Sequence, residues 1–233
     1  QIDSDWLCLD DEAYPEVLRK LPFAPPVLFF RGDPARMAGL SLAVVGARRC
    51  TMMGIEIAES FSRFAVGSNF VVVSGMARGI DQAAHRGARG RTIAVLGQGL
   101  ASPMSASRRG CLGRILKAGG LVLSEFLPHL PASRWTFPQR NRIIAGLSRS
   151  VLVVEATRRS GALITARHAL EYGRDVLAVP GHPGQPLAQG CLKLLREGAR
   201  MVASRSDLED ALGVAGVIPT AHGNLLDGHP CGV

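Results

Sequence analysis

The sequence predicts an α/β fold with a doubly wound, mostly parallel sheet and helices on both of its faces. Two observations carry this prediction. Short apolar runs rich in β-branched residues recur from residue 40 onward, and segments with apolar residues at helical spacing lie between most of them. Runs that are apolar on both faces are typical of central parallel strands, and their alternation with helices is typical of a doubly wound sheet. A chain of 233 residues is long enough to bury a substantial core.

Six of these apolar runs are predicted to be strands. In chain order they are SLAVVG (41–46), FVVVSG (70–75), TIAVLG (92–97), LVLSEF (121–126), SVLVVEA (150–156) and DVLAVPG (175–181). Amphipathic helices are predicted for 51–65, 79–88, 160–173 and 189–199, and the stretch Ile143 to Leu147 reads as buried helix. Thr51 is the expected N-terminal cap of the first of these helices.

The composition divides the chain into three parts. Residues 1–39 are rich in proline and are expected to form an extension that packs on the main domain, with a short helix in YPEVLRKLP and a short strand in PPVLFFRGD. Residues 40–212 carry the alternating strands and helices of the main domain. Residues 213–233 are rich in Gly, Pro, His and Ala, which predicts a linker or flexible tail.

The charge favours a polyanionic partner. The net charge is +8, and all but three of the 27 basic residues are arginine. Arginine matches phosphate through two parallel hydrogen bonds. A GC-rich genome explains the arginine preference equally well, but it does not explain the net charge. The five cysteines are widely spaced and no CxxC pair exists, so neither a zinc site nor a disulfide framework is indicated. Free thiols are typical of a cytoplasmic protein, and no apolar run is long enough for a membrane span.

The turns that follow the predicted strands are the candidate binding elements. Ligands bind an open α/β sheet at the carboxyl ends of its strands, where small residues and helix N-termini accommodate anions. Arginine recurs in three of these turns, which are Gly46-Ala47-Arg48-Arg49, Ser74-Gly75-Met76-Ala77-Arg78-Gly79 and Thr157-Arg158-Arg159-Ser160-Gly161. The pattern predicts an anion site at this edge of the sheet.

Enzymatic chemistry has little support in the sequence. The P-loop pattern is absent, and the dinucleotide fingerprint appears only as a fragment at 97–102, so no cofactor is expected. Glu125 and Glu155 end predicted strands, where each is expected to accept from a helix N-terminus or an arginine. Asp81 and His85 stand four residues apart on a helix, which favours a local side-chain pair over a catalytic dyad. No catalytic or metal-binding residue is predicted.

The chain resembles the DNA-processing protein A family. The resemblance rests on VVGARRCTMMG, VVVSGMARGIDQAAHRGA, TIAVLGQGL, LVLSEF, the segment from Phe137 to Gly181 and QGCLKLLREGA, which follow the family's order. It implies an extended Rossmann-like fold without catalytic activity. It also implies binding of single-stranded DNA, loading of the RecA recombinase in natural transformation, and a homodimer. The family's frequent N-terminal helical domain and C-terminal winged helix have no counterpart in this sequence.

The family's DNA site transfers to matching positions. Its Gly-Ser/Thr-Arg turn corresponds to Gly46-Ala47-Arg48, where Ala47 lacks the hydroxyl group, and its Phe-Pro-x-Arg-Asn-Arg segment corresponds to 137–142. The family's Tyr-Pro-Pro loop is replaced by ASPMSASRRG (101–110). The expected DNA-binding residues are Gly46, Arg48, Ser74, Gly75, Arg78, Arg134, Phe137, Arg140, Asn141, Arg142 and Arg174.

The sequence leaves several alternatives open. Phe137 stacks on a base or packs in the core, and Arg142 meets a phosphate or forms an internal salt bridge with Glu125 or Glu155. Arg149, directly before a strand, is expected to be solvated surface. For the whole protein, one rival is a nucleotide or phosphosugar hydrolase of the lonely-guy type, although the P-G-G-x-G-T run of those enzymes is absent. The other rival is an interaction module whose basic surface docks an acidic protein.

Overall fold

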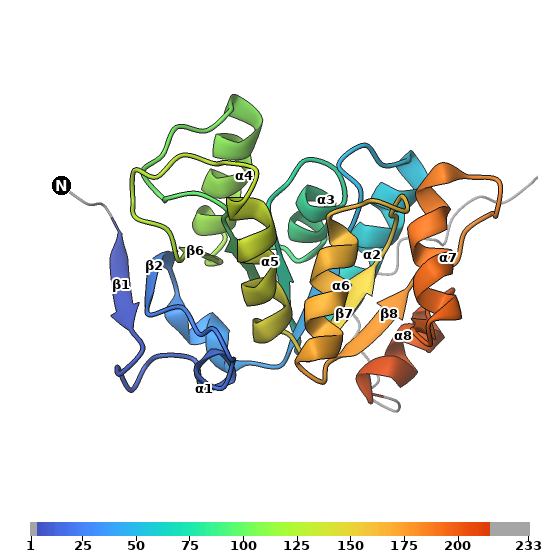
Figure 1. Ribbon diagram of the computed structural model, residues 1–233, viewed down its shortest axis with the longest axis horizontal. Coiled ribbons are helices and arrows are strands. Elements are labelled where there is room, and N and C mark those ends of the chain that lie inside the picture. Colours follow the sequence, from blue (N-terminus) through green and yellow to red (C-terminus); the bar gives the residue numbers. More distant parts are fainter. Residues whose placement is uncertain (1–3, 215–233) are drawn as a thin grey trace, which may run out of the picture.

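The structure is a computed structural model of the 233-residue chain and describes residues 4–214. Its centre is one open sheet with the strand order β1-β2-β6-β5-β4-β3-β7-β8-β9 (Figure 1). The strands are β1 (Asp5–Cys8), β2 (Val27–Gly32), β3 (Ser41–Val45), β4 (Val71–Ser74), β5 (Thr92–Val95), β6 (Leu121–Ser124), β7 (Ser150–Val153), β8 (Asp175–Ala178) and β9 (Arg200–Met201). The helices are α1 (Glu16–Arg19), α2 (Met52–Gly67), α3 (Ile80–Gly87), α4 (Ala106–Lys117), α5 (Thr136–Leu147), α6 (Ala162–Glu171), α7 (Gln189–Arg196) and α8 (Arg205–Leu212), with the 3-10 turns η1 (Pro34–Ala38) and η2 (Pro186–Ala188).

The sheet is doubly wound, as predicted. From β3 the chain moves outward through β4, β5 and β6, and every pair along this path is parallel. It then crosses back to place β7 on the other side of β3 and continues to β8 and β9, again in parallel. The strand order therefore reverses between β3 and β7, which is the position where open α/β sheets bind their ligands.

Helices cover both faces of the sheet because alternate strand residues point to opposite sides. Val45 and its neighbours on one face pack against α1, α5, α6 and α7, and Figure 1 shows α5 and α6 in front of the sheet. Val44 and its neighbours on the other face pack against α2, α3 and α8, while α4 covers the part near β5 and β6. The central strands β3 to β7 are fully buried, which explains their apolar, β-branched sequences.

The six predicted strands are β3 to β8, and the predicted helices are α2, α3, α5, α6 and α7. The expected cap of α2 is also confirmed, since Thr51 Oγ1 accepts a hydrogen bond from the Gly54 N–H at 3.0 Å. Two helices were not predicted. In α4 only Cys111 and Ile115 are buried, so its sequence carries a weak apolar pattern. The sequence contains a signal for the start of α8: Ser204 and Asp207 have the spacing of a capping box, and in the structure they form one.

The N-terminal residues extend the central sheet. The short helix expected in YPEVLRKLP is α1, and the strand expected in PPVLFFRGD is β2, which pairs antiparallel with β6 and with β1. The boundary near residue 39 stays a prediction. Of the tail predicted for 213–233, residues 215 and beyond lie outside the described residues. Across residues 4–214, no helix combines the length and apolarity needed to cross a membrane.

Candidate nucleic-acid interface

A cavity of about 270 Å³ lies beside the reversal point between β3 and β7. Its walls come from the turns after β3 and β4, from the start of α5, and from the start of α6. The N-terminal ends of α5 and α6 lie side by side in the upper part of Figure 1. The expected DNA-binding residues that line it are Gly46, Arg48, Phe137, Arg140 and Asn141. The fold thus brings residues up to 95 positions apart in the sequence into one site.

Arg140 is built into the wall of this cavity. Its side chain is 4% exposed, and its Nη1 donates a hydrogen bond to the carbonyl oxygen of Val95. Its Nε has no hydrogen-bond partner. Gly75 makes room for the guanidinium group, because a Cβ atom at that position would lie 2.6 Å from Arg140 Cζ. Glycine is therefore required in the turn after β4 if the guanidinium group is to reach the cavity.

The charges around Arg140 are unbalanced. Burial lowers the pKa of Arg140 to about 10; the attraction of Asp81 opposes this shift, and the nearby cations Arg108 and Arg48 add to it. Burial also raises the pKa of Asp81, although Arg140 and two backbone N–H groups oppose that shift. Arg48 and Arg108 both repel the charge of Arg140, and Asp81 attracts it, which leaves a positive field in a site that is partly shielded from water. Such a site attracts an anion more strongly than an exposed arginine does.

Phe137 combines packing with access to the cavity. One side of its ring lies against the backbone of Gly97, where a Cβ atom would be 2.9 Å from Phe137 Cδ1. The guanidinium carbon of Arg48 lies 4.9 Å from the centre of the ring, in a cation–π arrangement. The ring is half-buried and Arg48 is exposed. The structure thus places a cation and an aromatic ring side by side at the mouth of the cavity.

Three other expected residues have structural partners. The Ser74 hydroxyl group is buried and donates to the carbonyl oxygen of Val44 at 2.7 Å. Asn141 Nδ2 donates to the carbonyl oxygen of Gly161 at 3.2 Å, which ties α5 to the start of α6. Gly46 lets the turn after β3 pass close to α3, since a Cβ atom there would lie 2.7 Å from Ile80 Cγ1. Gly46 and Asn141 thus help to shape the cavity, whereas Ser74 does not line it and its hydroxyl group is already hydrogen-bonded.

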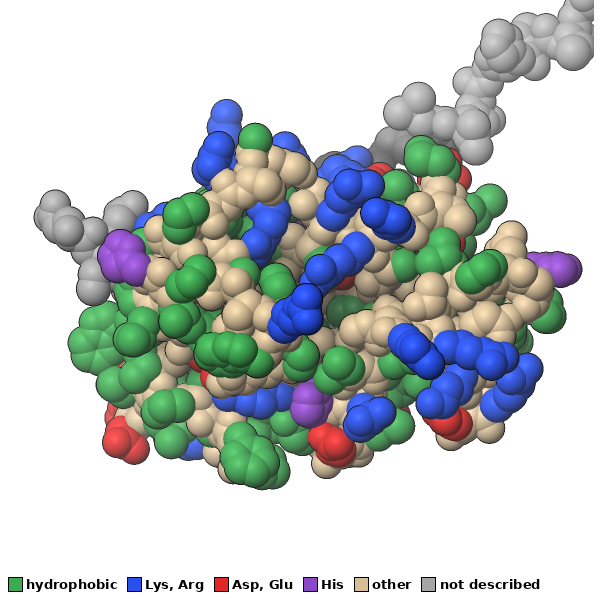
Figure 2. Space-filling view, turned by 45° about the horizontal axis from the view of Figure 1, so that its top comes forward, with side chains coloured by type: hydrophobic (Ala, Val, Ile, Leu, Met, Phe, Trp, Pro, Cys, Tyr) green, Lys and Arg blue, Asp and Glu red, His purple; other side chains and the backbone are tan. Residues whose placement is uncertain are grey.

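Arg78 and Arg134 are exposed at the same edge. Arg78 lies in the turn between β4 and α3, and this turn packs on the turn that carries Arg48. A Cβ atom on Gly79, whose φ is +89°, would lie 2.8 Å from the Arg48 carbonyl oxygen. Arg134 precedes Trp135, the N-cap residue of α5. Figure 2 shows Lys and Arg side chains gathered across the middle and upper part of this face, with few acidic side chains between them.

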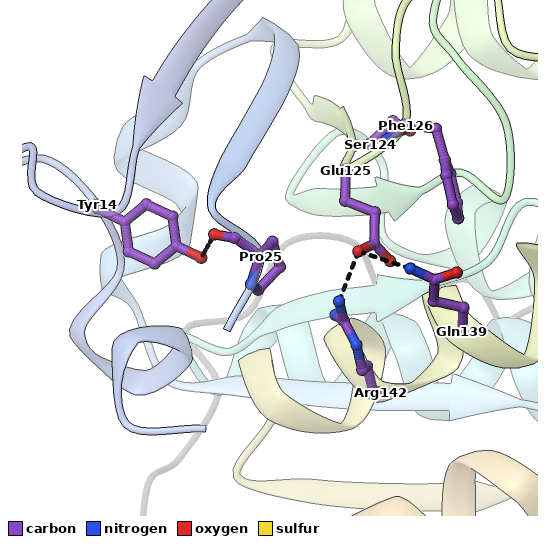
Figure 3. A network of polar contacts seen from close by, with 7 residues as sticks. All are labelled: Tyr14, Pro25, Ser124, Glu125, Phe126, Gln139 and Arg142. Carbon is purple, nitrogen blue, oxygen red and sulfur yellow. Dashed lines mark hydrogen bonds and ion pairs between the residues drawn. The ribbon is translucent and has the colours of Figure 1, made fainter. Parts of the chain in front are cut away.

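Arg142 is engaged inside the protein. Its Nη2 lies 2.5 Å from Glu125 Oε2, and Gln139 Nε2 donates to the same oxygen at 3.3 Å (Figure 3). The two charged side chains are 12% and 6% exposed. Arg142 is not among the residues that line the cavity. The internal salt bridge that the sequence left open is therefore the arrangement that the structure shows.

Arg174 lies apart from the other expected residues. It directly precedes β8, so it stands at the amino ends of the parallel strands, whereas the cavity lies at their carboxyl ends. There it borders a separate hollow that Asp175 and Arg200 also line. Arg174 was expected from the family resemblance alone, although its place directly before the predicted strand 175–181 already puts it at the amino edge of the sheet.

Arg108 belongs to the charge cluster but was not predicted. It stands in the first turn of α4, and its Nη1 donates to Gln98 Oε1 at 2.5 Å. Gln98 in turn donates to the carbonyl oxygen of Pro103 at 3.2 Å, which holds the loop 101–105 in place. A signal was available, because ASPMSASRRG follows the third predicted strand and therefore lies at the same edge as the other arginine-bearing turns.

The acidic residues and the histidine of this region have structural partners. Glu155 accepts hydrogen bonds from the backbone N–H and from Oγ1 of Thr51, at 2.9 and 2.6 Å, as expected of a residue that meets a helix N-terminus. The expected pair of Asp81 and His85 is wrong: Asp81 accepts from the Ala77 N–H at 3.2 Å, and His85 Nδ1 lies 2.7 Å from Thr92 Oγ1. Within residues 4–214, no cluster of three or more metal-ligating side chains occurs.

Comparison with known proteins places the chain among DNA-processing proteins. The family described as DNA recombination-mediator protein A matches residues 5–213. Protein Smf of Synechocystis is 43% identical over 220 residues, which are 91% of this chain and 55% of that protein. The chain therefore spans about half the length of that relative.

Two solved structures share the fold. DNA processing protein A of Streptococcus pneumoniae superposes with a TM-score of 0.83 at 39% identity, over 89% of this chain and 74% of that one. DNA processing protein A of Helicobacter pylori, whose structure was described for its mode of single-stranded DNA binding, superposes with a TM-score of 0.80 over 91% of this chain and 96% of that one. Its identity is 24%, so this likeness concerns the fold alone.

Proposed function

The chain belongs to the DNA recombination-mediator protein A family, and from this premise we propose that it binds single-stranded DNA at the carboxyl edge of its sheet. The family is one of DNA-binding mediators and not of enzymes. The observation that carries the proposal is the cavity where Arg48 and Arg140 face a single carboxylate beside the half-buried ring of Phe137. A basic groove with an aromatic face is how proteins hold flexible single strands without sequence readout.

Each part of the site has a role in this proposal. Arg48, Arg78, Arg108, Arg134 and Arg140 meet backbone phosphates, and Phe137 stacks on a base. Ser74, Gly75, Gly46 and Asn141 hold the turns in the geometry that the cations need. Arg142 supports α5 from the side that faces away from the DNA, through Glu125.

The wider biological role rests on family membership. We propose that the protein protects incoming DNA and loads the RecA recombinase onto it during natural transformation, that it acts in the cytoplasm, and that it forms a homodimer. Cys8, Cys50, Cys111 and Cys191 are free thiols, which suits a reducing compartment. Light scattering at micromolar concentration tests self-association, and a RecA filament-assembly assay on DNA coated with single-strand-binding protein tests loading.

The hydrolase alternative gains no support from the described residues. The carboxylate of Glu155, which follows β7, accepts hydrogen bonds from the backbone N–H and the hydroxyl group of Thr51. Incubation with nucleotides and phosphosugars, followed by chromatography, is expected to show no turnover.

Binding of labelled oligonucleotides tests the proposal directly. If about four phosphates are neutralised, the logarithm of the binding constant for single strands should fall with the logarithm of salt concentration with a slope of about −3. We expect single strands to bind more tightly than duplexes of the same length, and affinity to rise with length until the groove is filled. The control is Arg149→Gln, because Arg149 is exposed and precedes β7 at the opposite edge. Equal affinity for single and double strands at equal salt would contradict the proposal, and equal competition by an acidic polypeptide would favour the interaction module.

A further inference from the structure

Trp135 is an exposed aromatic residue that the site described above does not use. It is 57% exposed and occupies the N-cap position of α5, without a capping hydrogen bond from its side chain. Exposed tryptophans are usually mobile, but this indole is supported from below. Its ring meets Phe126 edge to face, with the ring centres 5.8 Å apart and an interplanar angle of 78°. Phe126 is 5% exposed and follows Glu125 at the end of β6 (Figure 3). Trp135 therefore presents a large aromatic surface that is both accessible and fixed.

The loop that carries Phe126 is anchored to the same edge as the DNA site. The Ala101 N–H donates to the carbonyl oxygen of Pro128 at 2.8 Å, and the Gly99 N–H donates to that of Leu130 at 2.9 Å. These hydrogen bonds join the loop after β6 to the loop after β5. The support beneath Trp135 is thus continuous with the turn on which Phe137 packs.

The binding elements follow the strand order along this edge. Trp135 rests on Phe126, after β6, and Phe137 rests on Gly97, after β5. The guanidinium group of Arg140 rests on Gly75, after β4, and the Arg48 turn follows β3. Because β6, β5, β4 and β3 are consecutive neighbours in the sheet, the supports of Trp135 and Phe137 follow neighbouring strands, which are about 5 Å apart. Successive nucleotides of a stacked strand are about 3.4 Å apart, so the step corresponds to one or two nucleotides.

The electrostatics between the two rings suit a phosphate. The first turn of α5 contains no acidic residue, so the positive end of the helix dipole is not neutralised there. Arg134, next to Trp135, is exposed. The nearby carboxylate, Glu125, is neutralised by Arg142. A DNA backbone that passes from Phe137 toward Trp135 therefore meets positive potential throughout.

We propose that Trp135 is a second base-stacking surface, which holds a nucleobase of the single strand one or two nucleotides from the base on Phe137. This proposal rests on the proposed DNA-binding function. It extends the DNA-binding groove from the cation cluster across β5 to β6. The exposed indole of Trp135 then contacts nucleic acid and not a protein partner. Trp135 supplies stacking area, and the phosphate between the two bases lies near Arg134 and the N-terminus of α5.

The two tryptophans of the chain provide a matched experiment. Trp6 on β1 is 58% exposed, so it is as accessible as Trp135 but lies outside the proposed groove. In a Trp6→Phe variant, oligo(dT) should quench the fluorescence of Trp135 by at least about half at saturation. In a Trp135→Phe variant, the same DNA should leave the fluorescence of Trp6 nearly unchanged. Fluorescence anisotropy of labelled oligo(dT), measured in parallel, reports binding itself.

Affinity gives a second readout. Trp135→Ala should weaken binding of a long oligo(dT) by about 5- to 150-fold, the loss that accompanies one stacked base, and this loss should persist at high salt. Trp135→Phe should restore most of the affinity, and oligonucleotides too short to reach from Arg48 to Trp135 should bind all variants alike. Circular dichroism checks that each variant is folded.

The outcomes separate the two proposals. If the anisotropy shows binding but the fluorescence of Trp135 stays unquenched, the stacking role of Trp135 is wrong and the DNA-binding function stands. If the parent protein does not bind oligo(dT), the function itself is wrong. If Trp135→Ala leaves DNA affinity unchanged but abolishes self-association in light scattering, the indole belongs to an interface between two copies of the chain, which also overturns the proposal.

Discussion

The buried opposite charges of Arg140 and Asp81 should make the fold less stable than a neutral version of the same site. Both side chains are less than 10% exposed, and each has a pKa shifted toward its uncharged form, even with the attraction of the partner included. The perturbation is the double substitution Arg140→Met with Asp81→Asn. Methionine keeps the aliphatic part of the arginine stem next to Gly75, and asparagine keeps an oxygen that accepts from the Ala77 N–H.

The pKa of Arg140 sets the magnitude. Its value falls from 12.5 to about 10, so at every pH below about 10 the charged form is less stable in the folded than in the unfolded protein. A shift of this size corresponds to about 3 kcal/mol. The raised pKa of Asp81 also lowers the stability of the fold at neutral pH, because the carboxylate is charged there. We therefore expect the double variant to unfold with a free energy about 1–4 kcal/mol higher than the parent, the range measured for neutral replacements of buried ion pairs.

Urea unfolding at pH 7, followed by circular dichroism, measures this difference, and an unchanged m-value shows that the two folds are comparable. Each single substitution should be less stable than the double one, because it leaves one buried charge without its partner. The double variant should also lose most of its affinity for oligo(dT). A double variant that is less stable than the parent by more than about 1 kcal/mol, at the same m-value, would refute the view that this charge is retained for binding at the expense of stability.

Two further predictions concern single residues. Arg48→Gln should make the slope of log K against log salt for single-strand binding less steep by about 0.7, which is the contribution of one phosphate contact. The control Arg49→Gln, at the exposed neighbouring residue, should change the slope less. Equal changes in the two variants would show that Arg48 has no special position. Burial lowers the pKa of His85 to about 3. Below the unfolded-state pKa of about 6.5, the unfolded chain therefore binds a proton at His85 that the folded protein does not bind. The free energy of unfolding should fall by about 2 kcal/mol between pH 7.5 and 5 for this reason. His85→Gln should lack this part of the pH dependence in urea unfolding, and an unchanged pH profile in the variant would contradict the assignment.

The sheet could be predicted from the sequence because its central strands are buried on both faces. A run such as Val71 to Val73 has no polar position, and this pattern has few explanations other than a central parallel strand. The edge elements were harder to recognise. The strand β9 has two residues, both exposed, and α4 contains Gly110 and Gly113, which weaken its helical sequence pattern. Short or polar elements acquire their structure from tertiary contacts that leave little trace in the local sequence.

The candidate site shows the same division. The arginine-bearing turns after β3 and β4 were recognised because a strand followed by a glycine-containing turn is a local pattern. The partners of individual side chains are not local: Arg142 and Glu125 are 17 residues apart, and their ion pair depends on the packing that brings α5 next to the residue that follows β6. Arg174 was expected from the family resemblance but lies at the other edge, whereas Arg108 was not expected and joins the cation cluster. The sequence identifies which residues carry a charge, but it does not predict which side chain each charged residue contacts.

The long crossover carried by α5 has a consequence for folding. Between β6 and β7 the chain passes over three strands, β5, β4 and β3, and α5 rests on all of them. The hydrogen bond from Arg140 to the Val95 carbonyl oxygen closes a loop of 45 residues. Contacts of such long sequence separation form late, because the intervening chain must be ordered first. We therefore expect the cation cluster to be assembled only when β3, β4 and β5 are already paired, so that a partly folded chain holds its arginines apart and does not retain DNA.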